Sequence, residues 1–176
     1  MSLLTSNVGR KVLMAVSGFF MVLFAVAHLA GNSTIFVGPD WINAYAEHLH
    51  SLPLVVWPFR AFMFVMLCIH VFFGVTLTLE NWGANPGKYA VKKRQKVTFA
   101  SNTMIWTGLL LLAFIVFHLL HFTLRVTPEV VQVLDAQGRF DVYSMMVGGL
   151  MDWGVAAVYI IAMVVLFLHT SHGIAS

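Results

Sequence analysis

The sequence predicts an all-α integral membrane protein, a bundle of transmembrane helices in a single domain. Of the 176 residues, 60% are hydrophobic and only 10% are charged, and the mean hydropathy is +0.86. A soluble domain of this length needs a more polar surface, so the apolar segments must face lipid. Four of these segments are close to the roughly 20 residues that cross a bilayer as a helix. The net charge of +3 therefore bears on membrane orientation and gives no indication of nucleic acid binding.

The first predicted span covers residues 12–30, contains no charged residue and follows the basic pair Arg10-Lys11. It is long enough to cross the membrane and lacks a small-residue cleavage site, so we interpret it as a retained helix and not as a signal peptide. In the connector at 32–56, a glycine-proline turn precedes apolar residues that recur every four positions. This spacing predicts a short amphipathic helix at the membrane interface, which Pro53 ends.

The second predicted span covers residues 59–79 and contains His70 and the only cysteine, Cys68. One cysteine can form neither an internal disulfide nor an iron–sulfur cluster, so we interpret Cys68 as a small buried apolar residue. The loop at 80–98 carries five basic residues. The positive-inside rule places this loop, and with it the N-terminus, in the cytoplasm.

The third predicted span, 103–124, contains two histidines, His118 and His121, and the fourth, 153–172, ends with His169 and His172. The connector at 125–149 has a Gln-Gly-Arg turn at 137–139, after which Asp141 is placed to cap a short helix.

Every predicted span therefore carries a histidine. An ionisable side chain in lipid is costly and indicates a functional site with a partner. At 1.5 Å per residue, His28 lies about 24 Å and His118 about 23 Å above the inner end of its helix, whereas His70 lies only about 14 Å above it. His169 is lower still. These levels predict two stacked histidine pairs, His28 with His118 and His70 with His169.

Paired histidines fill both axial positions of a haem iron, and two haems at different depths suit electron transfer. Two glycines, Gly74 and Gly173, each follow a histidine by four residues and leave room for a flat macrocycle or for a close helix. A histidine-lined proton or metal transporter is an alternative of a different class, although Asp152 is the only acidic residue of the spans and lies at an edge. The third hypothesis is a structural anchor whose histidines form hydrogen bonds between the helices.

Taken together, the motifs resemble the cytochrome b membrane-anchor subunit, of the two-haem single-anchor type, of succinate:quinone oxidoreductases and fumarate reductases. The resemblance covers the whole chain, and it rests on the order and spacing of the motifs. The matching pieces are His28-Leu-Ala-Gly-Asn, His48-Leu-His-Ser-Leu-Pro, Ile69-His70-Val-Phe-Phe-Gly, Thr107-Gly108 ten residues before His118, and Leu168-His169-Thr-Ser-His-Gly.

This resemblance implies that one histidine from each span binds haem, which selects His118 over His121 and His169 over His172. The implied cofactors are two haem b groups, the outer one on His28 and His118 and the one nearer the cytoplasm on His70 and His169. A fifth helix is also implied, and we expect it after Ser176. Haem propionates need basic or hydroxyl partners. Residues at suitable levels for that role are Arg10, Ser17, Lys96 and Ser171.

The resemblance further implies a multi-pass protein of the prokaryotic cytoplasmic (inner) membrane. There the chain would anchor a flavoprotein subunit and an iron–sulfur subunit and exchange electrons with membrane quinone. The dicarboxylate site would belong to those partners, since this chain has no dinucleotide-binding glycine motif. Both the succinate dehydrogenase of complex II and a quinol:fumarate reductase fit this description. We interpret His48 and His50 as solvated histidines, with the edge of a quinone site as the alternative.

Overall fold

The computed structural model describes residues 4, 6–83, 99–127 and 133–175, and this part of the chain is almost entirely helical and contains no strand. The elements in chain order are α1 (Asn7–Asn32), the 3₁₀ turn η1 (Ser33–Phe36), α2 (Pro39–His50), α3 (Pro53–Gly83), α4 (Phe99–His118), the π turn η2 (Leu119–Thr123), α5 (Val142–Met151) and α6 (Trp153–Ala175).

Four helical segments are long and apolar enough to cross a membrane, as predicted: Asn7–Phe36, Pro53–Gly83, Thr103–Thr123 and Trp153–Ile174. The first two begin earlier than predicted. At α1, the Ser6 side chain accepts a hydrogen bond from the Gly9 N–H at 3.0 Å and caps the helix there. At α3, Pro53 is the first helical residue, a position that suits proline because the missing N–H has no partner there in any case.

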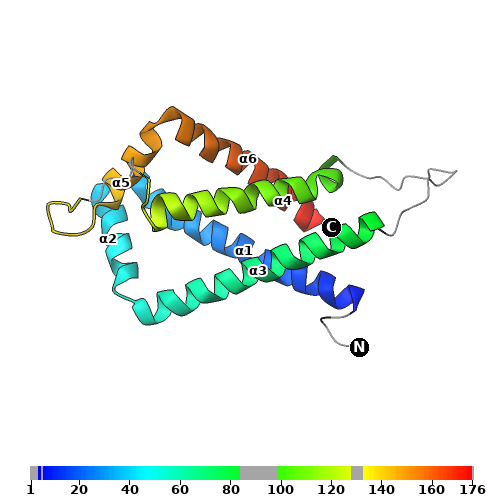
Figure 1. The fold of residues 1–176 in the computed structure, drawn as a ribbon. Coiled ribbons are helices and arrows are strands. Elements are labelled where there is room, and N and C mark those ends of the chain that lie inside the picture. The colour runs from blue at the N-terminus through cyan, green and yellow to red at the C-terminus, as the bar shows by residue number, and fades with distance from the viewer. Residues whose placement is uncertain (1–3, 5, 84–98, 128–132, 176) are drawn as a thin grey trace.

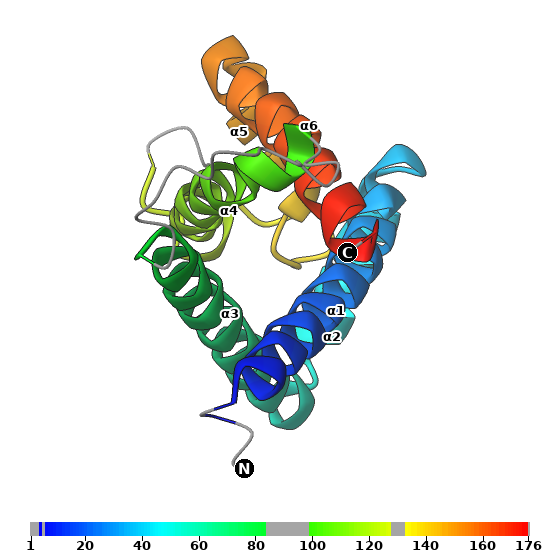
Figure 2. The same ribbon diagram turned by 90° about the vertical axis from the view of Figure 1, so that its right-hand side faces the viewer.

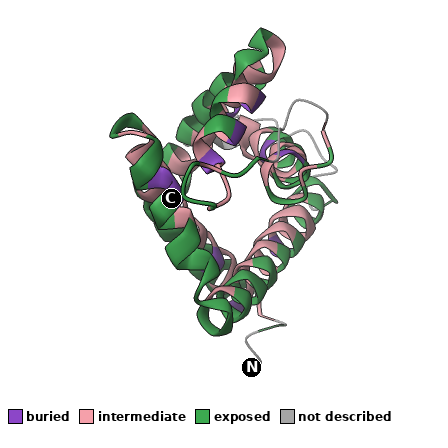
Figure 3. Cartoon of the chain, turned by 90° about the vertical axis from the view of Figure 1, so that its left-hand side faces the viewer, coloured by how far each residue is buried: buried purple, intermediate pink, exposed green. Residues whose placement is uncertain are grey.

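The four long helices form two pairs, in which α1 packs along α3 and α4 packs along α6. Figure 2 views them from the end where both termini lie, and contact between the two pairs is slight. Most of the long helices' surface is exposed (Figure 3), including large apolar side chains such as Phe64 and Phe167. This surface is compatible with a helical bundle surrounded by lipid. Cys68 is also exposed, so the expectation of a buried cysteine was wrong.

The opposite end of the molecule is covered by α2, residues 133–141 and α5, which we call the α2/α5 cap (Figure 1). Its core consists of Ile42, Val142 and Met145. The predicted helix before Pro53 is α2, but its apolar stripe of Trp41, Tyr45 and Leu49 is exposed and does not pack in the core. The cap is therefore held by the other face of α2. Trp41 and Leu49 stay exposed, whereas the Tyr45 ring also lies against Gly31 of α1.

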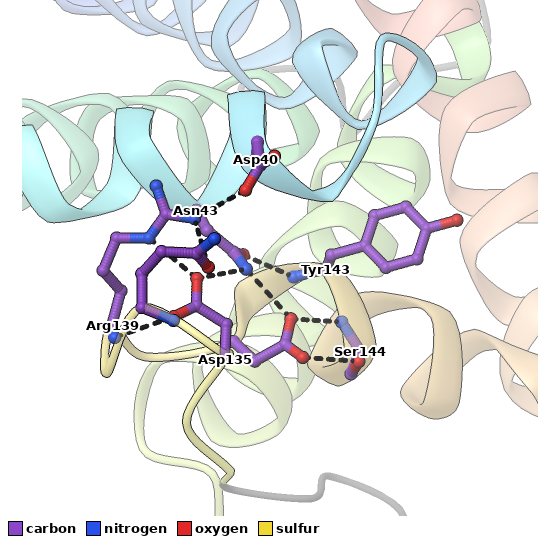
Figure 4. Close-up of polar contacts among 8 residues, drawn as sticks. Asp40, Asn43, Asp135, Arg139, Tyr143 and Ser144 are labelled. Atoms are coloured by element: carbon purple, nitrogen blue, oxygen red, sulfur yellow. Dashed lines mark hydrogen bonds and ion pairs between the residues drawn. The ribbon is translucent and has the colours of Figure 1, made fainter.

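A polar cluster joins α2 to the rest of the cap (Figure 4). Asn43, which is 1% exposed, donates to Asp135 at 3.2 Å and to Asp141 at 3.1 Å, and its carbonyl accepts from the Tyr143 N–H at 3.0 Å. Arg139 pairs with Asp135 at 2.7 Å and with Asp40 at 2.9 Å. Asp141 caps α5 as predicted, accepting from the Ser144 N–H at 3.0 Å. Residues distant in sequence thus close the cap through charge-assisted hydrogen bonds.

We expect acid to loosen this cap. Burial raises the pKa of Asp135, but the hydrogen bonds from Arg139 and Gln137 outweigh it, so the net pKa lies below the ordinary 3.8. Burial also raises the pKa of Asp141, but the hydrogen bonds from Ser144 outweigh this effect, so the net pKa of Asp141 is lowered as well. Carboxylates with lowered pKa stabilise the folded state above the unfolded-state pKa, and this stabilisation is lost as the pH falls through the folded-state pKa.

The measurement is hydrogen exchange of residues 39–50 and 133–151 from pH 7 down to 3. Protection there should fall below about pH 4, while α6 serves as the internal reference; unchanged protection of the cap at pH 3 would contradict this.

Candidate functional site

Four histidines from four different long helices meet in two pairs. The ring centroids of His28 on α1 and His118 on α4 are 5.8 Å apart, and the ring planes are perpendicular at 90°. The centroids of His70 on α3 and His169 on α6 are 6.3 Å apart, with the planes at 71°. We call the first the cap-proximal pair, since His28 is four residues from the end of α1 that leads to α2, and the second the cap-distal pair. These are the two pairings that the helix levels predict.

The ring separations match two imidazoles bound to opposite sides of one metal ion. An imidazole nitrogen lies about 2.0–2.1 Å from its metal, so two rings facing each other across the ion have centroids about 6 Å apart once the ring radius is added on each side. Within the described ranges, no group of three or more histidine, cysteine, aspartate and glutamate side chains could hold a metal ion. Two histidines at each level are fewer ligands than a structural zinc site needs, so a metal held there would need further ligands from elsewhere, such as those that a porphyrin provides.

The cap-distal histidines are both held through Nδ1. The Nδ1 of His70 lies 3.0 Å from the carbonyl oxygen of Met14, which can only accept, so this nitrogen carries the proton. The Nδ1 of His169 lies 3.0 Å from the Thr107 hydroxyl. That hydroxyl lies 3.1 Å from the Thr103 carbonyl oxygen and can donate to it, which leaves its lone pairs for His169. In both neutral rings, Nε2 then keeps its lone pair, as metal-binding histidines require.

Glycines on the neighbouring helices make room for these two rings. A Cβ on Gly18 would lie 3.0 Å from Cε1 and 3.1 Å from Nδ1 of His70, and a Cβ on Gly108 would lie 3.3 Å from Cε1 of His169. Each histidine thus rests on a glycine and bonds to a group within the same turn of the neighbouring helix. Sequence reasoning missed Gly18, and it used Thr107-Gly108 only to choose His118, whereas the structure places both residues against His169.

The two glycines that were chosen from the sequence, Gly74 and Gly173, have more space around them than Gly18 and Gly108. A Cβ on Gly74 would come no closer than 4.0 Å to the Met14 sulfur, and one on Gly173 would meet nothing within 4 Å among the described residues.

The cap-proximal pair has a different set of partners. The Nδ1 atoms of His118 and His121 lie 3.2 and 3.0 Å from one hydroxyl, that of Tyr159 on α6. The ring of His28 has the Asn32 amide nitrogen at 3.3 and 3.4 Å from its two nitrogens. Tyr159 was not singled out from the sequence, since a tyrosine in an apolar helix carries no spacing signal of its own.

The π turn η2 begins directly after His118 and contains His121. His121 is completely buried and stacks on Phe117, with the ring centroids 5.4 Å apart and the planes at 28°. Single π turns are rare in proteins overall, and those that occur often lie at functional sites. No feature of the sequence predicted this turn, which brings the second histidine of the 117–122 motif to the same hydroxyl as the first.

The proposed propionate partners divide into three cases. Arg10 pairs with Glu80 at 2.6 Å and with Asn7, yet its Nε is buried without a hydrogen-bond partner among the described residues. Ser17 is 1% exposed and lies 2.8 Å from the Leu13 carbonyl oxygen and 3.0 Å from that of Met14, the oxygen that also holds His70. Ser171 lies 3.0 Å from the Leu168 carbonyl oxygen, and Lys96 lies outside the described residues. One donor of Arg10 is therefore buried without a hydrogen-bond partner among the described residues, and Ser17 is adjacent to the cap-distal pair.

The histidines of α2 lie apart from both pairs, whereas His172 is three residues beyond His169 on α6 and interacts with it electrostatically. His48 and His50 are exposed on α2, and the Nδ1 of His50 lies 2.7 Å from the Ala46 carbonyl oxygen. His172 is half-buried near the end of α6. Comparisons with models of protein families, with curated proteins and with solved structures give no match.

Proposed function

We propose that this chain is the di-haem cytochrome b subunit of a succinate:quinone oxidoreductase. The observation that supports the proposal most strongly is the arrangement of His28, His118, His70 and His169. They come from four apolar helices and form two pairs with ring-centroid separations of 5.8 and 6.3 Å, close to the roughly 6 Å expected for two imidazoles that share one metal ion. The cap-distal pair would hold one haem b and the cap-proximal pair the other.

The protein's contribution to this chemistry follows from its own residues. A haem held by two histidines would leave no position for oxygen and would supply one-electron transfer. Met14 and Thr107 orient the cap-distal imidazoles through Nδ1, which presents Nε2 and raises the basicity of the ligands. Arg10, Ser17 and Ser171 are the described candidates for propionate contacts. Arg10 has a buried Nε, and each serine hydroxyl would have to leave the main-chain carbonyl to which it donates.

The two pairs lie at different depths of the bundle, so electrons would cross it in two steps. We propose that a flavoprotein and an iron–sulfur subunit dock on the cytoplasmic side, and that membrane quinone is the other redox partner. The basic loop at 80–98 and Arg10-Lys11 support a cytoplasmic N-terminus. We propose a prokaryotic inner membrane as the location from the family resemblance alone. The membrane subunit of a quinol:fumarate reductase would use the same residues in the opposite direction of electron flow.

A dithionite-reduced minus oxidised visible spectrum of the purified membrane protein tests the proposal, with the haem content per chain measured by the pyridine haemochrome. We expect a b-type spectrum and two haems per chain. A protein that has no haem band after expression with sufficient haem would reject the proposal, and stoichiometric zinc or copper in that protein would favour a transporter.

A further inference from the structure

We propose that Tyr159 is a positioning residue of the cap-proximal site, which holds the Nδ1–H of His118 and links it to His121. This inference rests on the proposed function, because it concerns the histidine that would bind the second haem. It assigns a role to Tyr159, to His121 and to the π turn between the two histidines, none of which the electron-transfer proposal uses.

The hydroxyl of Tyr159 lies at the centre of a three-residue chain. Its oxygen is 3.2 Å from Nδ1 of His118 and 3.0 Å from Nδ1 of His121, both within hydrogen-bond distance. A phenolic hydroxyl has one proton to donate and lone pairs with which to accept. It can therefore donate to only one of the two nitrogens while accepting from the other.

Binding of haem by His118 would fix which group donates in each of these two hydrogen bonds. If His118 binds iron through Nε2, its neutral ring must carry the remaining proton on Nδ1, and that N–H donates to the Tyr159 oxygen. The Tyr159 O–H is then directed to Nδ1 of His121, which accepts, and His121 carries its proton on Nε2. Each of the three groups has a defined donor or acceptor role in this one assignment.

Aromatic side chains and α5 pack around the three hydrogen-bonded side chains and hold them in place. Three aromatic rings enclose Tyr159, with ring centroids at 5.1 Å (Phe114), 6.0 Å (Phe117) and 5.8 Å (Phe122). His121 is packed against α5, where a Cβ on Gly149 would lie 3.0 Å from its Nε2. His121 is completely buried and Tyr159 is half-buried, and apolar surroundings of this kind strengthen the hydrogen bond between them.

The π turn supplies the second histidine. Residues 119–123 are wound more widely than an α-helix, which changes the angular relation of His121 to His118 from the one that a regular α-helix would impose. The wider turn therefore accompanies the convergence of both Nδ1 atoms on one hydroxyl. We infer that the turn serves the chain His118–Tyr159–His121.

A hydrogen bond accepted from Nδ1–H makes an axial imidazole more electron-rich and stabilises the oxidised iron. Tyr159→Phe removes the acceptor and keeps the ring, so the reduction potential of the haem held by His118 should rise. The potential of the haem held by His70 and His169 should stay unchanged. His121→Leu should shift the same potential upward by a smaller amount, because Tyr159 can still accept from His118.

The experiment is a potentiometric titration of the purified haem-loaded protein, monitored by visible and EPR spectra. The component that disappears in His118→Ala identifies the cap-proximal haem. Tyr143→Phe is the matched control, since this variant also removes a tyrosine hydroxyl, one that points away from the polar cluster of the cap (Figure 4). A rise confined to the cap-proximal potential, or loss of that haem alone, supports the inference.

Unchanged potentials in Tyr159→Phe would overturn it, as would a shift or loss that affects both haems equally. A larger shift in His121→Leu than in Tyr159→Phe would also overturn it, because the hydroxyl would then not be the immediate partner of the ligand. A wild-type protein without haem would reject the proposed function itself, which keeps the two failures distinct.

Discussion

Replacing His118 with alanine is expected to remove one of the two haems, whereas replacing His121 with alanine should leave both in place. The ring of His118 faces His28 at a centroid separation of 5.8 Å, and without it His28 has no opposing ligand. His121 instead lies 3.0 Å from the Tyr159 hydroxyl through its Nδ1 and stacks on Phe117. The measurement is the haem content per chain of each purified variant.

Two controls make this comparison sharp. His121→Gln keeps most of the buried volume, so it separates a loss of ligation from a loss of packing, which for a completely buried side chain is substantial. His48→Ala removes an exposed histidine of α2 and should change nothing. If His121→Ala loses a haem while His118→Ala retains both, then His121 is the ligand and the assignment from motif spacing was wrong.

Gly18→Val is expected to abolish the haem of the cap-distal pair. The first added carbon already lies 3.0 Å from Cε1 of His70, tighter than ordinary van der Waals contact, and the two further methyl groups need the space of the ring. His70 would have to leave the Met14 carbonyl oxygen, and with it the position facing His169. The cap-proximal haem should remain, so the expected haem content falls from two per chain to one.

A graded series tests the cause. Gly18→Ala should weaken the same haem, and Gly108→Ala should weaken it less, because the nearest atom of His169 is 3.3 Å from the added carbon. Helix propensity predicts the opposite sign, since alanine in place of a mid-helix glycine usually stabilises a helix by about 0.5–1 kcal/mol. Ala15→Val places similar bulk on an exposed position of α1 as a control. Full retention of both haems in Gly18→Val would show that His70 does not depend on this contact.

The sequence alone determined the number of long helices, their approximate limits and the levels of the histidines. These follow from local properties: the length of each apolar segment, the polar connectors between the segments and the constant rise of a helix. Levels were sufficient to pair His28 with His118 and His70 with His169, since side chains at one depth of a bundle are neighbours. The Asp141 cap is equally local, because its partner is three residues away.

Only the tertiary structure decided which groups surround those histidines. The contacts of Gly18 with His70, of Thr107 with His169 and of Tyr159 with His118 depend on how each helix is rotated about its axis. One residue of an α-helix turns this direction by about 100°, and spans that are apolar on all sides leave the rotation undetermined by hydrophobic pattern. The π turn and the cap cluster around Asn43 likewise join segments whose relative orientation no local signal encodes. The depth of each candidate ligand was thus a property of the sequence, and its second hydrogen-bond partner was a property of the packed helices.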